Sequence, residues 1–165
     1  MQPYDPESVI YKSAKSFLGY HRLDLACKFL YIEDFYKKNY DKHIIELYKK
    51  HILCRTGGAE PKDRFIPRQD VKDSINDYIK SFNELIISMS KHGYDKKFPI
   101  RFSKHGITNG AHRIACAIYF NVPIACIEVN KNGKGTWDRK WFEKNNFSES
   151  DIVLLENTTR KLLNE

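Results

Sequence analysis

The chain has 165 residues, of which 41% are hydrophobic and 13% aromatic, so it can bury a core and is not intrinsically disordered. At this length we expect one compact domain with an appended helical segment. No apolar run approaches the roughly 20 residues that cross a membrane, so a membrane span is not expected. The formal net charge of +7 favours anionic partners in general, such as nucleotides, phosphosugars or nucleic acid.

The first residues and the cysteines indicate a compartment. Residues 1–7 contain neither a basic head nor an apolar stretch, so we expect no signal peptide. None of the four cysteines, at positions 27, 54, 116 and 126, forms a Cys-x-x-Cys pair, which disfavours a zinc knuckle or a thioredoxin-type motif. We therefore expect buried free thiols and a cytoplasmic location.

Apolar periodicity predicts that the N-terminal third of the chain is helical. Apolar side chains recur at spacings of three and four over residues 23–31 and again over residues 44–52, so we assign residues 12–54 to helices. The segment 55–61 contains two glycines and a proline, which indicates a loop. We divide the chain accordingly into a helical N-terminal extension, residues 1–54, and a second unit, residues 55–165.

The strongest helical pattern lies over about residues 70–92. Apolar residues from Val71 to Met89 form one continuous stripe at helical period. Asp70 can cap the start of this helix, and Gly93 can end it in a left-handed conformation.

Strands and a further helix are predicted beyond this point. A strand over residues 98–102 turns and returns over residues 106–108. A helix over residues 110–121 follows, and the almost continuously apolar segment 123–129 predicts a central strand covered on both faces. After an exposed turn, two helices close the chain, over residues 137–144 and 148–163. This order predicts an α+β fold with a small mixed sheet and flanking helices.

The junction between the returning strand and the next helix has the composition of a phosphate-binding site. The strand ends at Thr108 and the helix begins near Gly110; a first helical turn carries unpaired N–H groups and partial positive charge. Gly110 lacks a Cβ, so a ligand can approach the backbone, while His112 and Arg113 offer side-chain donors. The string Gly-x-His-Arg also occurs at Gly19–Arg22, but no strand precedes that copy, and we interpret it as coincidental.

The same region resembles the ParB/sulfiredoxin superfamily over about residues 60–130. Residues 85–89, Leu-Ile-Ile-Ser-Met, correspond to the "L-x-x-S-I" helix of that superfamily, and Gly93 follows them. The "P-I-x-V" strand corresponds to residues 99–102, Pro-Ile-Arg-Phe, and the closing pattern "D-G-x-H-R-x-x-A" or "G-E-R-R" corresponds to residues 109–115. The resemblance implies a ParB/sulfiredoxin-like fold.

The resemblance also implies a nucleotide-phosphate site, with a helix hydroxyl facing the phosphates. The predicted nucleotide-binding residues are Ser88, Thr108, Asn109, Gly110, Ala111, His112 and Arg113. Ala111 stands where sulfiredoxins carry a catalytic cysteine, so sulfiredoxin chemistry is not expected. His112 stands where ParB partition proteins carry an arginine, and only about 35 residues follow Val129, too few for their DNA-binding module. Asn109 stands where the pattern has an acid.

The remaining branch of the superfamily is kinase-like and includes free-serine kinases. The resemblance to it implies transfer of a phosphoryl group from ATP, ADP or CTP, with Mg²⁺, to a hydroxyl of an amino acid, polyol or sugar. Serine kinases of this branch use a glutamate from a loop before the long helix, which corresponds to Glu60. The predicted catalytic residues are Glu60 and His112, and the predicted acceptor-binding residues are Arg55, Lys62 and Trp141. No residue is assigned to the metal.

The loop at 55–62 and the segment Trp137–Phe142 are similar to relatives found beside surface-polysaccharide genes, which implies a role in polysaccharide biosynthesis. Two alternatives stay open. The chain could bind or hydrolyse a nucleotide without an acceptor, or it could be a DNA-binding accessory protein of the ParB type. Steeply salt-dependent binding to DNA would support the latter, although we expect no DNA partner.

Overall fold

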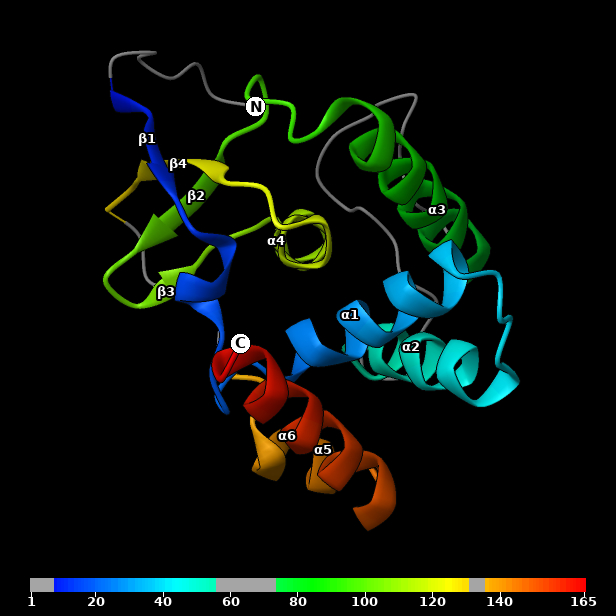
Figure 1. Ribbon diagram of the computed structural model, residues 1–165. Helices are drawn as coiled ribbons and strands as arrows, with labels where there is room; N and C mark the ends of the chain where they lie inside the picture. Colours follow the sequence, from blue (N-terminus) through cyan, green and yellow to red (C-terminus); the bar gives the residue numbers. More distant parts are fainter. Residues whose placement is uncertain (1–7, 56–73, 131–135) are drawn as a thin grey trace.

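The computed structural model of the chain describes residues 8–55, 74–130 and 136–165. These residues form a small mixed sheet flanked by helices (Figure 1), which confirms the coarse fold prediction. The strands are β1 (Ile10–Lys12), β2 (Ile100–Ser103), β3 (Gly106–Ile107) and β4 (Ile124–Glu128). The helices are α1 (Leu23–Tyr36), α2 (Lys42–Arg55), α3 (Ile75–His92), α4 (Ala111–Phe120), α5 (Arg139–Lys144) and α6 (Glu149–Leu163), with a 3-10 helix η2 (Ala14–Phe17).

The strand order in the sheet is β1-β4-β2-β3, so β4 is central, as its apolar run predicts. Cys126 of β4 pairs with Ile100 of β2 in parallel and with Ile10 of β1 in antiparallel register. Strands β2 and β3 form the expected hairpin, with Phe102 opposite Ile107. Strand β4 is flanked by two neighbouring strands, and its residues 124–127 are all buried.

The prediction that residues 12–54 are helical is correct for α1 and α2 but wrong at its start. Lys12 ends the edge strand β1, and only the short 3-10 helix η2 lies between this strand and α1. A three-residue strand is too short to show an alternating pattern. Its conformation depends on pairing with β4, a distant part of the chain.

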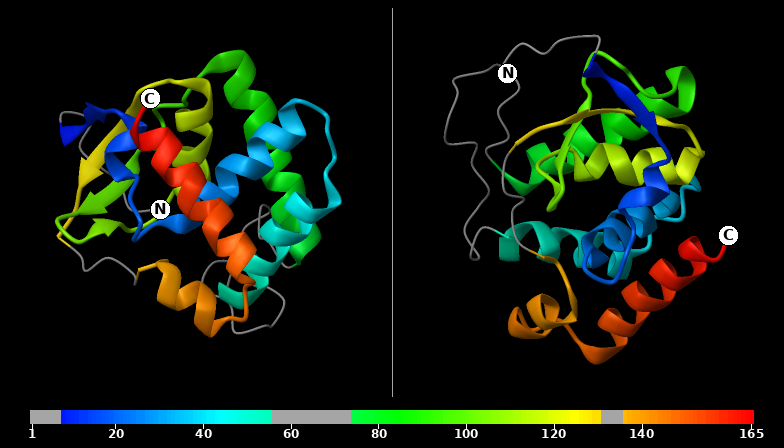
Figure 2. Two further views of the ribbon diagram at one scale, coloured as in Figure 1. Left: turned by 60° about the horizontal axis from the view of Figure 1, so that its bottom comes forward. Right: turned by 90° about the vertical axis from the view of Figure 1, so that its left-hand side faces the viewer.

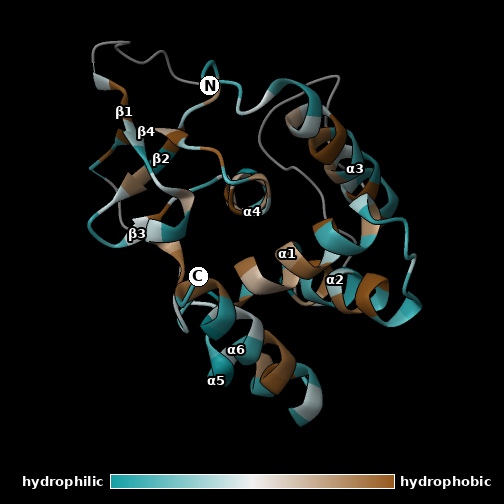
Figure 3. Cartoon of the chain, viewed as in Figure 1, coloured by the Kyte–Doolittle hydropathy of each residue, from teal (hydrophilic) through white to brown (hydrophobic). Residues whose placement is uncertain are grey.

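Helix α4 occupies the centre of the molecule, between the sheet and helices α1 and α3 (Figure 1). Residues 114–118 of α4 are buried, and Figure 3 shows this helix coloured mainly as hydrophobic. Helices α5 and α6 lie on the side of α1 that faces away from the sheet (Figure 2). Helices α1 and α2 share one hydrophobic core with α4 and the sheet. Within the described ranges, no helix has both the length and the apolar character needed to cross a membrane.

The helix ends follow local side-chain chemistry. Ser74 caps α3 by accepting the Asp77 N–H at 3.2 Å, and Gly93 ends it at φ +71°. The prediction that Asp70 caps this helix is wrong: Asp70 lies outside the described residues, and the helix begins at Ile75, directly after Ser74. Ser148 caps α6 by accepting the Asp151 N–H at 3.1 Å.

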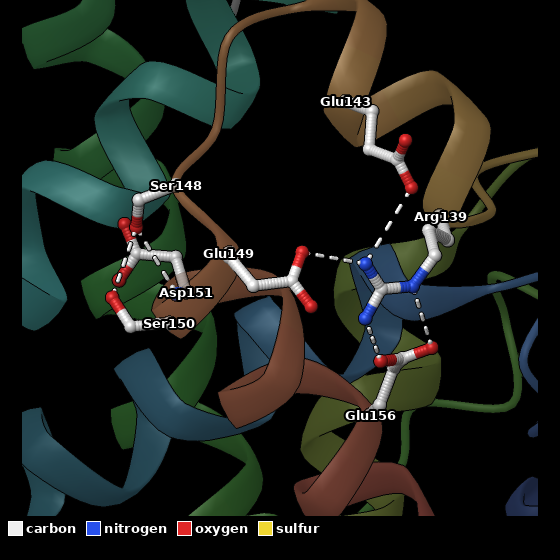
Figure 4. Close-up of polar contacts among 7 residues, drawn as sticks. All are labelled: Arg139, Glu143, Ser148, Glu149, Ser150, Asp151 and Glu156. Atoms are coloured by element: carbon white, nitrogen blue, oxygen red, sulfur yellow. Dashed lines mark hydrogen bonds and ion pairs between the residues drawn. The ribbon is translucent and has the colours of Figure 1, made fainter.

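A cluster of ion pairs joins the two closing helices (Figure 4). Arg139 of α5 donates to Glu149 at 2.8 Å and to Glu156 through two nitrogens, while Glu143 lies 3.5 Å away. The guanidinium fork therefore holds α5 against α6 through several charged contacts.

The four cysteines are free thiols, as expected, but they differ in burial. Cys27, Cys116 and Cys126 are buried, and burial raises the pKa of Cys27 to about 12, whereas Cys54 is half-buried. We therefore expect a thiol reagent at neutral pH to modify Cys54 rapidly in the folded protein and all four thiols after unfolding. Equal labelling rates of Cys54 and Cys27 in the folded protein would contradict this burial pattern.

Candidate functional site

Strand β3 leads directly into the N-terminus of α4. The Thr108 N–H and hydroxyl both donate to the Arg101 carbonyl, at 2.9 and 3.0 Å, and Asn109 Oδ1 accepts the Arg101 N–H at 3.4 Å. These bonds hold the chain so that Gly110 is the N-cap of the helix, at φ +89°. The first helical hydrogen bond runs from the Ile114 N–H to the Gly110 carbonyl at 3.0 Å.

Gly110 is required here for two reasons. Its φ lies in the left-handed region that other residues adopt only with strain. A Cβ at this position would also lie 2.4 Å from Ile100 Cδ1 and 3.1 Å from Arg113 Nη2. From the sequence we expect a glycine here because a ligand approaches the backbone. The structure gives a second reason, since a Cβ at this position would contact the buried Ile100.

Arg113 lies beside Gly110, on the side of the helix end that faces the segment before β2. Its Nη1 donates to the Phe98 carbonyl and lies 3.5 Å from the Tyr94 hydroxyl. Among the described residues, no hydrogen bond engages Nη2 or Nε of Arg113. The guanidinium is thus anchored at one nitrogen while others stay available to a ligand.

His112 faces the opposite side, toward α2 and α3. Its Nε2 lies 2.9 Å from the Tyr48 hydroxyl, and its ring meets the Phe82 ring edge-on at 4.6 Å. The Tyr78 ring lies 6.3 Å away. Burial raises the pKa of Tyr48 well above its ordinary value, so this hydroxyl stays protonated at neutral pH.

Arg55, at the end of α2, is joined to the same region through Tyr78. Its Nη2 donates to the Tyr78 hydroxyl at 3.1 Å, and its guanidinium lies 5.5 Å from the centre of the Tyr78 ring. The start of α4 thus has Arg113 on one side, and a histidine, two tyrosines and a second arginine on the other. We call this set the tip cluster: Tyr48, Arg55, Tyr78, His112 and Arg113.

Sequence reasoning missed the two tyrosines of the tip cluster. Both lie in apolar stripes at helical period, where a tyrosine is typical of core packing. Only their phenolic hydroxyls, which need partners when buried, could have indicated a polar role.

The other predicted site residues lie elsewhere. Ser88 is exposed on α3, six residues or about 9 Å along the helix axis beyond Phe82, the residue whose ring meets His112. Trp141 packs in an aromatic group with His51 at 5.4 Å and Trp137 at 4.9 Å. The predicted base Glu60 and the predicted ligand-binding Lys62 lie outside the described residues.

The second Gly-x-His-Arg string has a different geometry. Helix α1 begins at Leu23, so His21 and Arg22 precede the helix instead of projecting from its first turn. Arg22 Nε and Nη2 donate to the two carboxylate oxygens of Asp24 at 2.8 and 2.7 Å. Two of the three guanidinium nitrogens of Arg22 are therefore bound to a carboxylate.

Asp24 belongs to a buried polar group beneath the aromatic residues of α5. Lys28, which is completely buried, lies 3.4 Å from Asp24, and burial lowers the pKa of Lys28 to about 8 despite the carboxylate. Nearby His51 is also completely buried, and neither ring nitrogen has a hydrogen-bond partner among the described residues. Burial lowers the pKa of His51 well below its ordinary value, so it is neutral at neutral pH.

The donor set at the tip cluster suits an anion and does not fit a metal ion. Mg²⁺ prefers oxygen ligands, usually one or two carboxylates together with substrate phosphates, and the five side chains of the cluster include no carboxylate. In the part of the chain that the structure describes, no group of three or more His, Cys, Asp or Glu side chains could hold a metal. Comparison with family models, with curated proteins and with solved structures found no match to this chain.

Proposed function

We propose that the protein is a nucleotide-dependent kinase with a ParB/sulfiredoxin-like fold, which transfers a phosphoryl group to a hydroxyl of a small acceptor such as an amino acid, a polyol or a sugar. The observation that carries this proposal is the start of α4. There a glycine N-cap lies at the positive end of a helix, with the guanidinium of Arg113 on one side and the imidazole of His112 on the other.

Phosphoryl transfer requires positioning and charge neutralisation more than covalent chemistry from the protein. The N–H groups of the first turn of α4 and the available nitrogens of Arg113 bind the phosphates. His112, held by Tyr48 on the other side of the helix end, adds an imidazole. Arg55 contributes a second guanidinium from the end of α2.

The proposed base is close to this cluster along the chain. Glu60 follows Arg55 by five residues, so at most about 18 Å of extended chain separates their Cα atoms. The acceptor hydroxyl gives its proton to the Glu60 carboxylate as its oxygen attacks the terminal phosphorus. The new O–P bond forms while the bridging P–O bond breaks, and the shortened nucleotide leaves with the negative charge that Arg113 neutralises.

The test is transfer of labelled phosphate from ATP, ADP and CTP to a panel of amino acids, polyols and sugars. We expect Arg113→Ala to weaken nucleotide binding. We expect Glu60→Gln to retain nucleotide binding and to slow transfer about 100-fold or more, since general-base catalysis contributes that much. Arg160→Ala, an exposed arginine on α6, is the matched control and should behave as wild type.

Three results would contradict the proposal in different ways. Transfer by Glu60→Gln at the wild-type rate would overturn the choice of base. Nucleotide hydrolysis that no acceptor stimulates would favour a nucleotide-hydrolysing module. DNA binding that weakens steeply with salt, without nucleotide use, would favour an accessory protein of the ParB type.

A further inference from the structure

A second concave site lies apart from the tip cluster, between the β2–β3 hairpin, η2 and the residues before α1. It is a cavity of about 370 Å³, within the range of pockets that bind small molecules. Five of its lining side chains are basic: Lys12, His21, Arg22, Lys104 and His105. Among the described residues no carboxylate lines this cavity, which we call the basic pocket.

The basic groups converge from separate parts of the chain. Lys12 ends β1, while Lys104 and His105 form the turn of the hairpin. The Lys12 ammonium lies 4.7 Å from the centre of the Phe102 ring, which forms part of the wall. A concave wall that carries charge of one sign focuses its field on the enclosed volume more strongly than the same charges spread over a flat surface.

Arg22 gives this pocket a rigid cationic wall. The residue is only 8% exposed, and Asp24 holds its Nε and Nη2. Among the described residues no hydrogen bond engages its third nitrogen, Nη1. Lys28 lies behind Asp24, so the buried group of two cations and one anion retains one positive charge beside the pocket.

We propose that the basic pocket binds the phosphate group of a small phosphorylated metabolite. A phosphate carries up to two charges and accepts hydrogen bonds from several directions, which matches cations that approach from different segments. Lining hydroxyls such as that of Ser103 add donors for the rest of the ligand. The volume of the pocket holds a compact metabolite.

This site is separate from the proposed nucleotide site. No member of the tip cluster lines the basic pocket. Ile100, at the start of β2, adjoins Gly110, whereas Ser103, at the end of the same strand, lines the pocket. Three residues of extended strand separate the two positions by about 10 Å. The proposal therefore goes beyond the kinase reaction and can be tested without nucleotide.

The test is calorimetric titration of the full chain with inorganic phosphate and with glycerol 3-phosphate, and with glycerol as the uncharged control. Lys12→Met removes charge from a half-buried position and Lys104→Met from an exposed one, and circular dichroism verifies that both variants fold. We expect each to weaken binding of both probes about tenfold or more, the effect of losing one charged contact. Arg113→Ala, at the tip cluster, should bind glycerol 3-phosphate as wild type does.

Two outcomes would overturn the proposal. The first is wild-type affinity in Lys12→Met and Lys104→Met together with loss of binding in Arg113→Ala, which would place the phosphate at the tip cluster. The second is no binding of either probe up to about 10 mM, well above the dissociation constant of a weak small-molecule site. Failure of the kinase assay would leave both measurements unaffected.

Discussion

Replacing Asp24 by Asn is expected to lower the free energy of unfolding by about 3–5 kcal/mol, because it leaves buried cations without their counter-charge. The Asp24 carboxylate accepts two hydrogen bonds from Arg22 and lies 3.4 Å from Lys28, which has no exposed surface. An ammonium that is enclosed by protein and loses its anion has no access to water that could replace the lost interaction.

Urea unfolding measures this loss. The matched control is Glu33→Gln, which breaks the exposed ion pair of Glu33 with Lys37 and should change stability by less than about 1 kcal/mol. The double variant Asp24→Asn with Lys28→Met should recover part of the loss, since it removes the cation that has lost its partner. If the double variant is no more stable than Asp24→Asn, an uncompensated charge is not the cause.

The same carboxylate predicts how stability depends on pH. Burial raises the pKa of Asp24, but the charges of Lys28 and Arg22 and the hydrogen bonds from Arg22 outweigh burial and hold this pKa well below its ordinary value of 3.8. A carboxylate with a depressed pKa contributes stability above its ordinary pKa and loses it as the pH falls toward the folded-state value. Below about pH 4, the wild type should therefore lose stability more steeply than Asp24→Asn.

The second large effect is expected at Gly110. Gly110→Ala should cost about 2–4 kcal/mol, because the new Cβ combines left-handed strain with a contact of 2.4 Å to Ile100 Cδ1. Gly93→Ala is the matched control: its φ of +71° brings strain, but nothing lies within 4 Å of its Cβ. Thermal or urea unfolding should show a clearly smaller loss for this control.

A second substitution separates the contact from the strain. Ile100→Val removes the Cδ1 atom and alone should cost about 0.5–1.5 kcal/mol. In the Gly110→Ala background, Ile100→Val should lower the free energy of unfolding by much less than it does in the wild type, or even raise it, since the shorter side chain relieves the contact with the new Cβ. Strictly additive losses would show that the close approach of Ile100 does not limit this position.

The sequence predicts best those elements whose signals are local. Helix α3 has a long apolar stripe and β4 has a continuous apolar run, and both occur where the sequence predicts them, although α3 begins at Ile75 instead of near residue 70. Strand β1 was missed because its conformation depends on a distant partner. For the same reason, sequence alone gives no sign of the polar group around Asp24, since an acid four residues before a lysine is typical of an exposed helical ion pair.

The candidate site likewise contains residues that local sequence places together and residues that only the tertiary fold brings in. Gly110, His112 and Arg113 are consecutive or nearly so, and a helix that begins at their junction is enough to bring them together. Tyr48 reaches His112 from α2, and Arg55 is joined to this region only through Tyr78 of α3, a tertiary arrangement that no local pattern indicates.

The pairing of β1 with β4 also constrains how the protein is made. The ribosome synthesises Ile10 long before it reaches Cys126, its partner in the sheet. At ordinary rates of elongation this delay is on the order of ten seconds. During that time the nascent chain carries an unpaired strand whose Ile10 and Tyr11 stay largely exposed even in the finished fold. A chaperone that binds unpaired strands would therefore find this stretch accessible until β4 has been made.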